Sequence, residues 1–424
     1  MNIELDRAID AHAEEAFTFL EALVRAKSTV GAEQPALKVF DQKLTALGFE
    51  TERLPFSNDV NTDPRAGVTP SPEVQSDGRY QVLARTPGTG GLRVMLNGHM
   101  DVVPAESPEL WTTPPFEPTR RNGRLYGRGA GDMKCGFAIG WLALRALKDV
   151  APELFATQRL GFLAVIEEEC SGNGALTAAS EHGALAPEVV LLEPTNLGIM
   201  VGGVGVLWVD VAVIASSGHA QQAGNHVNAI DLGVRLMEGL REWAADVWQA
   251  EPEPSMPDEE NPYNINVGKV RAGDWTSTAP STALFSVRIG FPRGWSATKA
   301  EAEVRAAIAS TVSNDAAFPS QPTVTLTGFR AEGYLLDADA PLVRDLTAAH
   351  MDAHGTKPKP FTLGSTTDAR IYLNHFHTPA VCFGAVAYDM HGIDESVELQ
   401  SIVDAAKTLA RFLLSRFTGA GELV

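Results

Sequence analysis

The chain has 424 residues, which is more than one hydrophobic core usually contains, so its length predicts two domains. With 44% apolar and 21% charged residues it has the composition of a globular protein, which excludes a disordered or fibrous chain. The net charge of −19 argues against nucleic acid or an anionic membrane as a partner, because both bind basic patches.

Targeting and redox signals in the sequence favour the cytoplasm. The N-terminal stretch MNIELDRAIDAHAEEAF lacks the basic start and apolar core of a signal peptide, and no apolar segment is long enough to span a bilayer. The three cysteines (Cys135, Cys170 and Cys382) are far apart and form no CxxC pair, so we expect no disulfide framework. We therefore expect a cytoplasmic protein without a membrane partner.

The first half of the chain has the pattern of a parallel α/β domain. Residues 3–48 predict two helices, because apolar side chains recur there at helical spacing. Three apolar runs then end in acidic or histidine residues, at 91–101, 158–169 and 188–195. Helical patterns separate these runs, at 132–150 and 173–184. Continuous apolar strands alternating with helices predict a mostly parallel sheet with helices on both faces, which binds ligands at the carboxyl ends of its strands.

The pattern changes after residue 200 and returns near residue 340. Alternating or β-branched strands are expected at 206–220, 285–291 and 322–329, and helices at 227–249 and about 297–313. These elements predict a separate α+β domain of ordinary size. We expect a metal-binding catalytic domain made of residues 1–204 and 331–424, interrupted by a lid and dimerisation domain at 205–330.

Histidines and acids stand where the predicted elements end or begin: His99 and Asp101, Asp132, Glu167 to Glu169, Glu193 and, far downstream, His391. Taken singly, each has an ordinary explanation as a helix cap, a solvated turn or a surface residue. Together, several carboxylates at one edge of a sheet would repel one another and raise each other's pKa. A bound cation removes that cost, and histidine with aspartate or glutamate suits zinc or a neighbouring divalent transition metal.

Five motifs in this order resemble one known family: GHMDVVP, GRGAGDMKCG, IEEECSGNGA, LLEPT and MHGIDES. They are similar to the motifs of the acetylornithine deacetylase and succinyl-diaminopimelate desuccinylase family, which consists of di-zinc amidohydrolases related to aminoacylase and zinc carboxypeptidases. The resemblance covers nearly the whole chain. It implies that His99 and Glu193 bind one metal ion, that Glu169 and His391 bind the other, and that Asp132, followed by a cis peptide bond, bridges both.

The resemblance also implies roles for the acids around this metal site. Asp101 would orient His99, which agrees with its place two residues further along the same strand end. Glu168 would be the general base that takes a proton from water and passes it to the departing amine. We align Glu168 rather than Glu167 with the base because EECSGNG matches the family's glutamate pair followed by a glycine, and Glu167 then takes the place of a more usual aspartate.

Three further residues are implied by resemblance alone. His219, in SSGHAQQAGNHVNAI, matches a histidine of the lid domain that reaches the active site of the partner subunit and stabilises the oxyanion, so a homodimer is expected. Arg288 stands where the family often has an arginine facing a substrate carboxylate. Thr366, in LGSTTDAR, matches a substrate loop.

The resemblance implies a metal-dependent hydrolase that cleaves the amide bond of an N-acyl amino acid or a related small molecule, typically acetylornithine. Two divalent ions would serve it, with Zn²⁺ favoured and Co²⁺ or Mn²⁺ as alternatives. A desuccinylase, a dipeptidase and a formylamino-pyrimidine deformylase stay open within the family, although Thr276 and Ser277 replace asparagines typical of desuccinylases. The competing class is a binding protein that has kept the fold and lost the site, and the presence of all five ligand positions argues against it.

Overall fold

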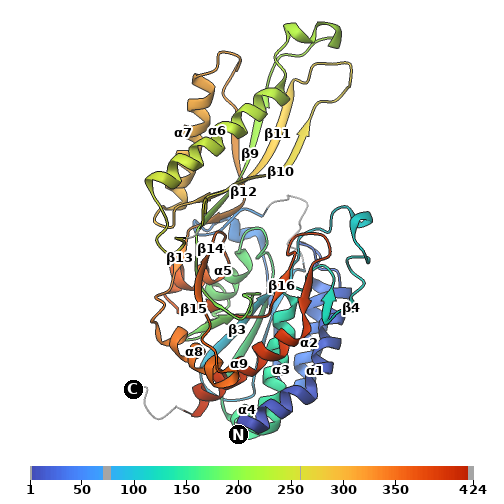
Figure 1. Ribbon diagram of the computed structural model, residues 1–424, viewed down its shortest axis with the longest axis vertical. Helices are drawn as coiled ribbons and strands as arrows, with labels where there is room; N and C mark the ends of the chain where they lie inside the picture. The colour runs from blue at the N-terminus through green and yellow to red at the C-terminus, as the bar shows by residue number, and fades with distance from the viewer. Residues whose placement is uncertain (1, 70–77, 258, 419–424) are drawn as a thin grey trace.

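The computed structural model describes residues 2–69, 78–257 and 259–418, which form a large domain and a small domain (Figure 1). Within the large domain, nine described strands form one sheet in the order β1-β2-β6-β3-β7-β15-β8-β13, and β14 pairs with β8. The strands are β1 (Glu50–Pro55), β2 (Tyr80–Arg85), β3 (Val94–His99), β6 (Leu160–Val165), β7 (Val189–Leu191), β8 (Ile199–Gly203), β13 (Tyr334–Leu335), β14 (Pro360–Leu363) and β15 (Ala380–Cys382).

The centre of this sheet is parallel, and its flanks are antiparallel except for the parallel pair of β14 with β8. Strands β6, β3 and β7 run in the same direction, as the three apolar runs predicted, and β15 is parallel to β7. The pairs β1–β2 and β2–β6 on one side, and β15–β8 and β8–β13 on the other, are antiparallel. The expected α/β class with an inserted α+β domain is confirmed, and the carboxyl ends of β3, β6 and β7 lie next to one another at one edge.

Helices cover the large sheet and enclose its core. They are α1 (Asn2–Arg25), α2 (Gln34–Leu47), α3 (Lys134–Val150), α4 (Pro152–Thr157), α5 (Asn173–Ser180), α8 (Pro341–His354) and α9 (Leu399–Thr418). Helices α1, α3, α9 and α8 pack side by side in that order (Figure 1). Helix α3 is buried on most sides, including Phe137 and Leu142, because its sequence is apolar around nearly the whole helix.

The small domain has an antiparallel sheet in the order β10-β11-β9-β12. Its strands are β9 (Gly205–Ile214), β10 (Ile265–Ala272), β11 (Thr282–Phe291) and β12 (Thr323–Ala331), and its helices are α6 (Ala229–Ala250) and α7 (Ala297–Ser313). Every second residue of β9 is buried, from Leu207 to Val213, which is the period expected when helices cover one face only. The small domain has a hydrophobic core of its own. The exact domain boundaries, after residue 204 and after residue 330, stay a prediction.

A third, smaller sheet lies beside the edge where the functional residues gather. Its strands are β4 (Thr119–Arg121), β5 (Arg124–Tyr126), β16 (Ala387–Tyr388) and β17 (Ser396–Glu398), in the order β16-β17-β5-β4. The turn between β16 and β17 carries His391, and the loop after β5 leads to Asp132. This sheet therefore brings two segments together that are far apart in the sequence. Short helical turns complete the fold: η1 (Asn58–Thr62), η2 (Pro108–Leu110), η3 (Ala220–Asn225) and η4 (Ile371–His375).

Candidate metal centre

The ends of three parallel strands bring the predicted metal ligands together. His99 is the last residue of β3, and β3 lies between β6 and β7. The acids that follow β6 (Glu168 and Glu169) and β7 (Glu193) therefore flank the imidazole of His99. Asp132 joins them from the loop before α3, and the Asp132–Met133 peptide bond is cis, as the resemblance implied.

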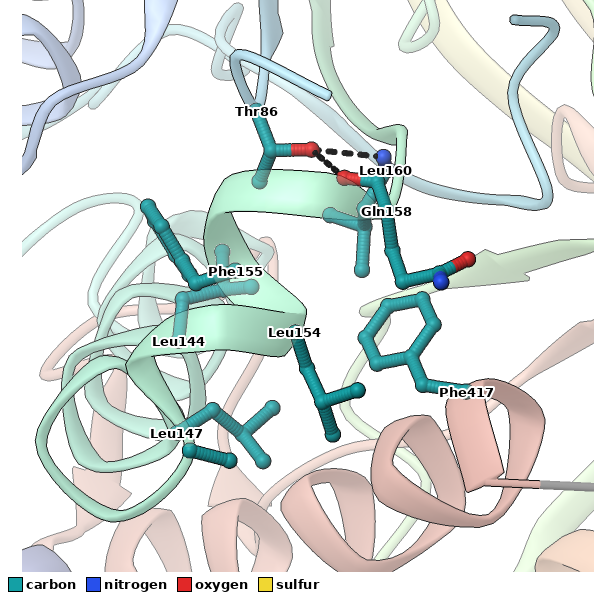
Figure 2. A pocket seen from close by; sticks show the side chains of 9 residues that line it. Thr86, Leu144, Leu147, Leu154, Phe155, Gln158, Leu160 and Phe417 are labelled. Carbon is teal, nitrogen blue, oxygen red and sulfur yellow. Dashed lines mark hydrogen bonds between the residues drawn. The ribbon is translucent and has the colours of Figure 1, made fainter. Parts of the chain in front are cut away.

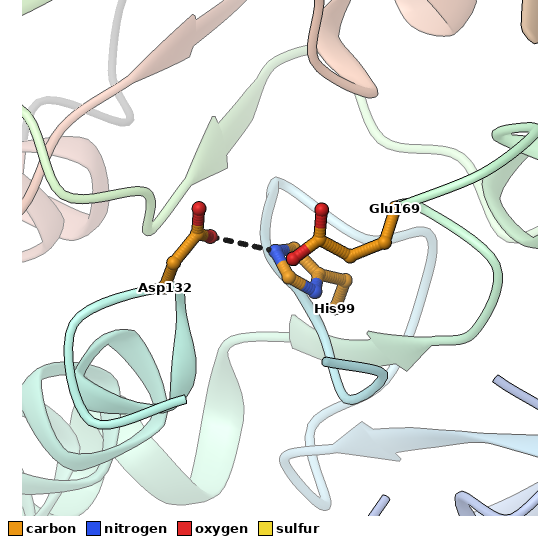
Figure 3. Close-up of side chains that lie close together, drawn as sticks. All are labelled: His99, Asp132 and Glu169. Atoms are coloured by element: carbon orange, nitrogen blue, oxygen red, sulfur yellow. Dashed lines mark hydrogen bonds and ion pairs between the residues drawn. The ribbon is translucent and has the colours of Figure 1, made fainter. Parts of the chain in front are cut away.

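Asp132 lies between two imidazoles. Its Oδ1 is 3.1 Å from Nε2 of His99, and its Oδ2 is 3.3 Å from Nε2 of His391. Nε2 of His391 is also 3.0 Å from Oε2 of Glu169, while Oε2 of Glu193 is 3.8 Å from Nε2 of His99. His99, Asp132 and Glu169 each offer a ligand atom, and these three atoms lie within 4.8 Å of one another (Figure 3). The structure therefore places all five predicted ligands in one cluster.

The carboxylates of this cluster are buried and close together, so a bound cation would stabilise their charged forms. Burial raises the pKa of Glu193 to about 8 and also raises that of Glu168 well above its usual value. Glu169 raises the pKa of His391 to about 11 by its negative charge. Burial alone would raise the pKa of Asp132, but hydrogen bonds from both imidazoles bring it well below its usual value. Carboxylates so crowded, with imidazoles between them, fit divalent cations of the zinc type.

Asp101 contacts the site in a different way from the one expected. Nδ1 of His99 lies 2.8 Å from the main-chain carbonyl oxygen of Asp101 but 3.8 Å from its carboxylate. The carboxylate instead accepts hydrogen bonds from the backbone N–H groups of Glu168, at 3.2 Å, and Glu169, at 3.0 Å. The backbone of Asp101 thus sets the orientation of His99, while its side chain holds the turn that carries two of the acids.

The three consecutive glutamates have different surroundings. Glu167 is fully buried and accepts a hydrogen bond of 2.6 Å from Arg79, which also pairs with Glu33. Ser171 donates a further hydrogen bond to Glu167 at 2.8 Å. By contrast, Glu168 lines the cavity beside the cluster, with its Oε2 3.9 Å from Nε2 of His99. Of the two acids considered for the base, only Glu168 faces the site.

Sequence reasoning missed Glu395, which ties two ligand segments together. Its fully buried carboxylate accepts hydrogen bonds from the backbone N–H groups of Asp132 and Gly131, both at 2.9 Å. It also pairs with Arg128 at 2.5 Å, and Arg128 donates to the main-chain oxygen of His391 at 3.3 Å. The sequence does contain a signal for this pair. In GRGAGD, Arg128 stands four residues before the ligand Asp132, and in MHGIDES, Glu395 stands four residues after the ligand His391.

A cavity of about 410 Å³ opens beside the cluster, between the two domains. Both predicted substrate residues line it: Arg288 from β11 and Thr366 from the loop after β14. The Thr366 hydroxyl has no hydrogen-bond partner among the described residues. His219 does not line the cavity. It is exposed on the small domain, where its Nδ1 accepts a hydrogen bond from the backbone N–H of Gln221 at 3.1 Å.

A second cavity, far from these residues, has no comparable chemistry. It is lined mainly by apolar side chains of α3, α4 and α9, including Leu147, Phe155 and Phe417 (Figure 2). At about 10 Å³ it holds at most one water molecule. The cavity at the carboxyl ends of the strands is the candidate active site because four predicted metal ligands, Glu168 and both predicted substrate residues line it.

The model of peptidase family M20/M25/M40 matches residues 95–415, which include every predicted metal ligand. The chain belongs to this family. Membership makes it a metal-binding hydrolase of the M20 type, and the expected relationship is thereby confirmed at the level of the family. Within the described residues, no helix is both long and apolar enough to cross a membrane.

Solved structures of two dipeptidases and of one protein described as an M20-family peptidase share this fold. Dug1p, a dipeptidase from Saccharomyces cerevisiae, is 15% identical with a TM-score of 0.80, and the match covers 100% of this chain and 99% of that one. Human carnosine dipeptidase 1 is 16% identical with a TM-score of 0.77, covering 99% and 100%. The Bacillus subtilis YXEP protein, described as a dinuclear metal binding peptidase, is 13% identical with a TM-score of 0.58, covering 95% and 98%.

Proposed function

We propose that this M20 protein is an amidohydrolase that cleaves the amide bond of an N-acyl amino acid, in the manner of acetylornithine deacetylase. One observation carries the proposal: Glu168, which is not one of the five predicted ligands, lies beside the cluster and lines a cavity that Arg288 also lines. Hydrolysis of an amide next to a carboxylate requires a general base, a metal centre that polarises the carbonyl, and a cation that binds the carboxylate. Glu168, the ligand cluster and Arg288 would supply these three parts.

The residues that would hold two divalent ions are those of the cluster. His99 and Glu193 would hold one ion, Glu169 and His391 would hold the other, and Asp132 would be shared by both. Zn²⁺ suits these donors best, with Co²⁺ or Mn²⁺ as alternatives. When bound, such ions polarise the scissile carbonyl and lower the pKa of water.

The remaining steps belong to side chains of the chain itself. Glu168 would take the proton from the attacking water and deliver it to the leaving amine, for which its place on the cavity wall is suitable. Arg288 would pair with the substrate carboxylate, and Thr366 would hydrogen-bond the substrate. His219 would stabilise the oxyanion in the active site of a partner subunit, so a homodimer is part of the proposal.

A dipeptidase is the second candidate function. It is favoured by the similarity in fold and length to Dug1p and to carnosine dipeptidase 1, both named as dipeptidases. The same cluster and the same cavity would serve either reaction, because a peptide bond and an N-acyl bond are both amides. Substrates separate the two, so a panel of N-acetyl amino acids should be assayed beside a panel of dipeptides, each with and without chelator.

The variant Glu168→Ala tests the base assignment. We expect it to bind its metal ions and to lose about 10²- to 10⁴-fold in kcat, the usual contribution of a general base. Metal content by mass spectrometry and kcat on the best substrate are the measurements. Glu181→Ala, which removes an exposed acid at the end of α5, is the control and should keep full activity. An active Glu168→Ala enzyme would refute the assignment, and failure of the metal-loaded wild type on every amide would refute the proposed function.

A further inference from the structure

The cavity beside the metal cluster has two chemically different walls. Its acidic end consists of four cluster ligands (Asp132, Glu169, Glu193 and His391), which would hold the metal ions, and of the proposed base Glu168. The rest of its lining, in the part of the chain that the structure describes, contains no carboxylate. This acid-free part of the lining, called the second wall, would face the substrate of the amidohydrolase proposed above, and its role rests on that proposed function.

A row of three side chains crosses the small-domain sheet and faces the cavity. Arg288 on β11 is the direct cross-strand partner of Asn266 on β10 and of Trp208 on β9, and all three line the cavity. Directly opposed residues of adjacent strands share a face of the sheet, with Cβ atoms about 4.5–5.5 Å apart. A hydrogen-bonding and cationic patch therefore lies immediately next to an indole ring.

Arg288 is held in place by neutral partners. Its guanidinium donates to Oδ1 of Asn264 at 2.5 Å and to the main-chain oxygen of Gly364 at 3.0 Å. Among the described residues Arg288 has no ion pair with an acid, so its charge is available to a substrate carboxylate. A second cation beside it would be repelled and would find no counter-ion on this wall.

Apolar side chains from both domains continue the wall beyond Trp208. Phe329 packs edge-on against the indole, with ring centroids 5.2 Å apart and an interplanar angle of 87°. Phe361 and Leu363 of β14 and Met200 of β8 face the same cavity from the large domain. Removing the apolar side chain of a substrate from water against such surfaces is favourable, and rings add edge-to-face contacts.

We propose that the enzyme selects amides of amino acids with an apolar, preferably aromatic, side chain next to a free carboxylate. The carboxylate pairs with Arg288 and Asn266, and the side chain packs against Trp208, Phe329 and Leu363. Amides of ornithine, lysine or diaminopimelate are disfavoured, because their side-chain ammonium group would enter an apolar wall beside an arginine. The substrate class thus differs from that of an acetylornithine deacetylase, although the reaction is the same.

The decisive experiment compares N-acetyl-L-phenylalanine, N-acetyl-L-leucine and N-acetyl-L-ornithine, which share acyl group and carboxylate. The expected result is a kcat/KM for the phenylalanine derivative at least about tenfold above that for ornithine. A preference for ornithine would overturn the inference and leave the proposed function standing. If no amide is hydrolysed, the proposed function fails. In that case the Kd of each N-acetyl amino acid for metal-loaded Glu168→Gln, measured by calorimetry, tests the inference separately from the reaction. Tighter binding of the ornithine derivative than of the phenylalanine derivative would overturn the inference.

Two variants locate the selectivity in the wall. Trp208→Ala should lower kcat/KM for N-acetyl-L-phenylalanine about tenfold or more while changing that for N-acetylglycine little. Trp243→Ala is the matched control, because Trp243 packs against Trp295 in the small domain and does not line the cavity. The inference would be overturned if Trp208→Ala lowered kcat/KM equally for N-acetyl-L-phenylalanine and N-acetylglycine. It would also be overturned if the folded control Trp243→Ala lost as much kcat/KM for N-acetyl-L-phenylalanine.

A charge introduced on the wall provides the converse test. Leu363 is 37% exposed, so Leu363→Glu places a carboxylate at the cavity without burying it fully. We expect this variant to shift the ornithine-to-phenylalanine ratio of kcat/KM at least about tenfold toward ornithine. Leu335→Glu, at a position 41% exposed on β13, which like β14 pairs with β8, lies outside the cavity lining and should leave the ratio unchanged. An unchanged ratio in Leu363→Glu would overturn the inference.

Discussion

At the scale of single residues, the cluster depends on acids that hold other groups in place. The carboxylate of Asp101 fixes the turn of Glu168 and Glu169, and that of Glu395 fixes the backbone of Asp132. Through Arg128, Glu395 also reaches the turn of His391. One buried ion pair thus sets the relative positions of two ligand segments.

Replacing Glu395 by glutamine tests this positioning role. The amide keeps the size of the side chain, but it places an N–H₂ group against N–H donors and leaves Arg128 without its buried counter-ion. We expect metal affinity to fall about 10- to 100-fold, as is usual when a group that orients metal ligands is lost. Competition with a coloured chelator measures the affinity, and melting curves establish that the variant is folded. Glu398→Gln, three residues further along and half-buried, is the control, and unchanged affinity in Glu395→Gln would contradict the role.

The positions of the metal ligands could be predicted from the sequence, but the positions of the side chains that orient these ligands could not. His99 and Glu193 follow apolar strands, so the strand ends alone placed them at one edge of the sheet. Glu395 and Arg128 lie in polar loops, where an acid or an arginine ordinarily faces solvent, and only the packing of two distant loops buries them. The contact of the Asp101 carboxylate with backbone N–H groups depends on a turn geometry that no sequence pattern indicates.

At the scale of secondary-structure elements, the site depends on how closely α3 approaches the end of β7. A Cβ atom on Gly136 would lie 2.2 Å from the carbonyl oxygen of Leu192, next to Glu193. Only glycine fits there, because the obstructing atom belongs to the backbone. The close approach keeps Asp132, just before α3, near Glu193, just after β7.

The variant Gly136→Ala should therefore destabilise the protein. Alanine favours helices by about 1 kcal/mol relative to glycine. Here the overlap with the backbone outweighs that gain, and overpacking typically costs about 1–3 kcal/mol. Denaturant unfolding would show the lower stability. Gly91→Ala, at a loop position where a Cβ atom meets nothing within 4 Å, is the control. A Gly136→Ala protein as stable as the wild type would show that α3 can move without cost.

The elements themselves were predictable in proportion to their length. Helices α1, α3 and α6 and the central strands β3, β6 and β7 carry apolar patterns, and the structure has them where the patterns predicted. The small sheet of β4, β5, β16 and β17 was not anticipated, because strands of two or three residues contain too few alternations to be recognised. The antiparallel flanks of the main sheet also escaped prediction, since pairing between distant strands is set by tertiary packing rather than by local pattern.

At the scale of the whole molecule, the position of His219 bears on the quaternary structure. Strand β9 begins beside the large domain and runs ten residues away from it before the segment that carries His219. At about 3.3 Å per residue, such a strand is roughly 30 Å long. His219 therefore lies far from the cavity of its own chain, which is the arrangement expected if it serves the active site of a partner.

Mixing two inactive variants tests this exchange between subunits. Glu168→Gln lacks the base and His219→Ala lacks the oxyanion donor, but a mixed dimer contains one site with both groups intact. After subunit exchange at equal amounts, we expect about one quarter of wild-type activity. Light scattering should give twice the chain mass of 45.3 kDa. A mixture as inactive as its components, in dimers shown to exchange, would exclude a role for His219 across subunits.

The pairing of β8 with β13 has a consequence for the architecture of the chain. Gly203 and Tyr334 are antiparallel partners, so the polypeptide leaves the large domain and re-enters it at adjacent positions. In topological terms the whole small domain is the connecting loop of a β-hairpin. The small domain brings its own two ends together, because Val206 of β9 pairs with Ala331 of β12, so the hairpin can carry the insertion without a long flexible loop to close. A tight turn in its place would reconnect the same two strands without altering their register.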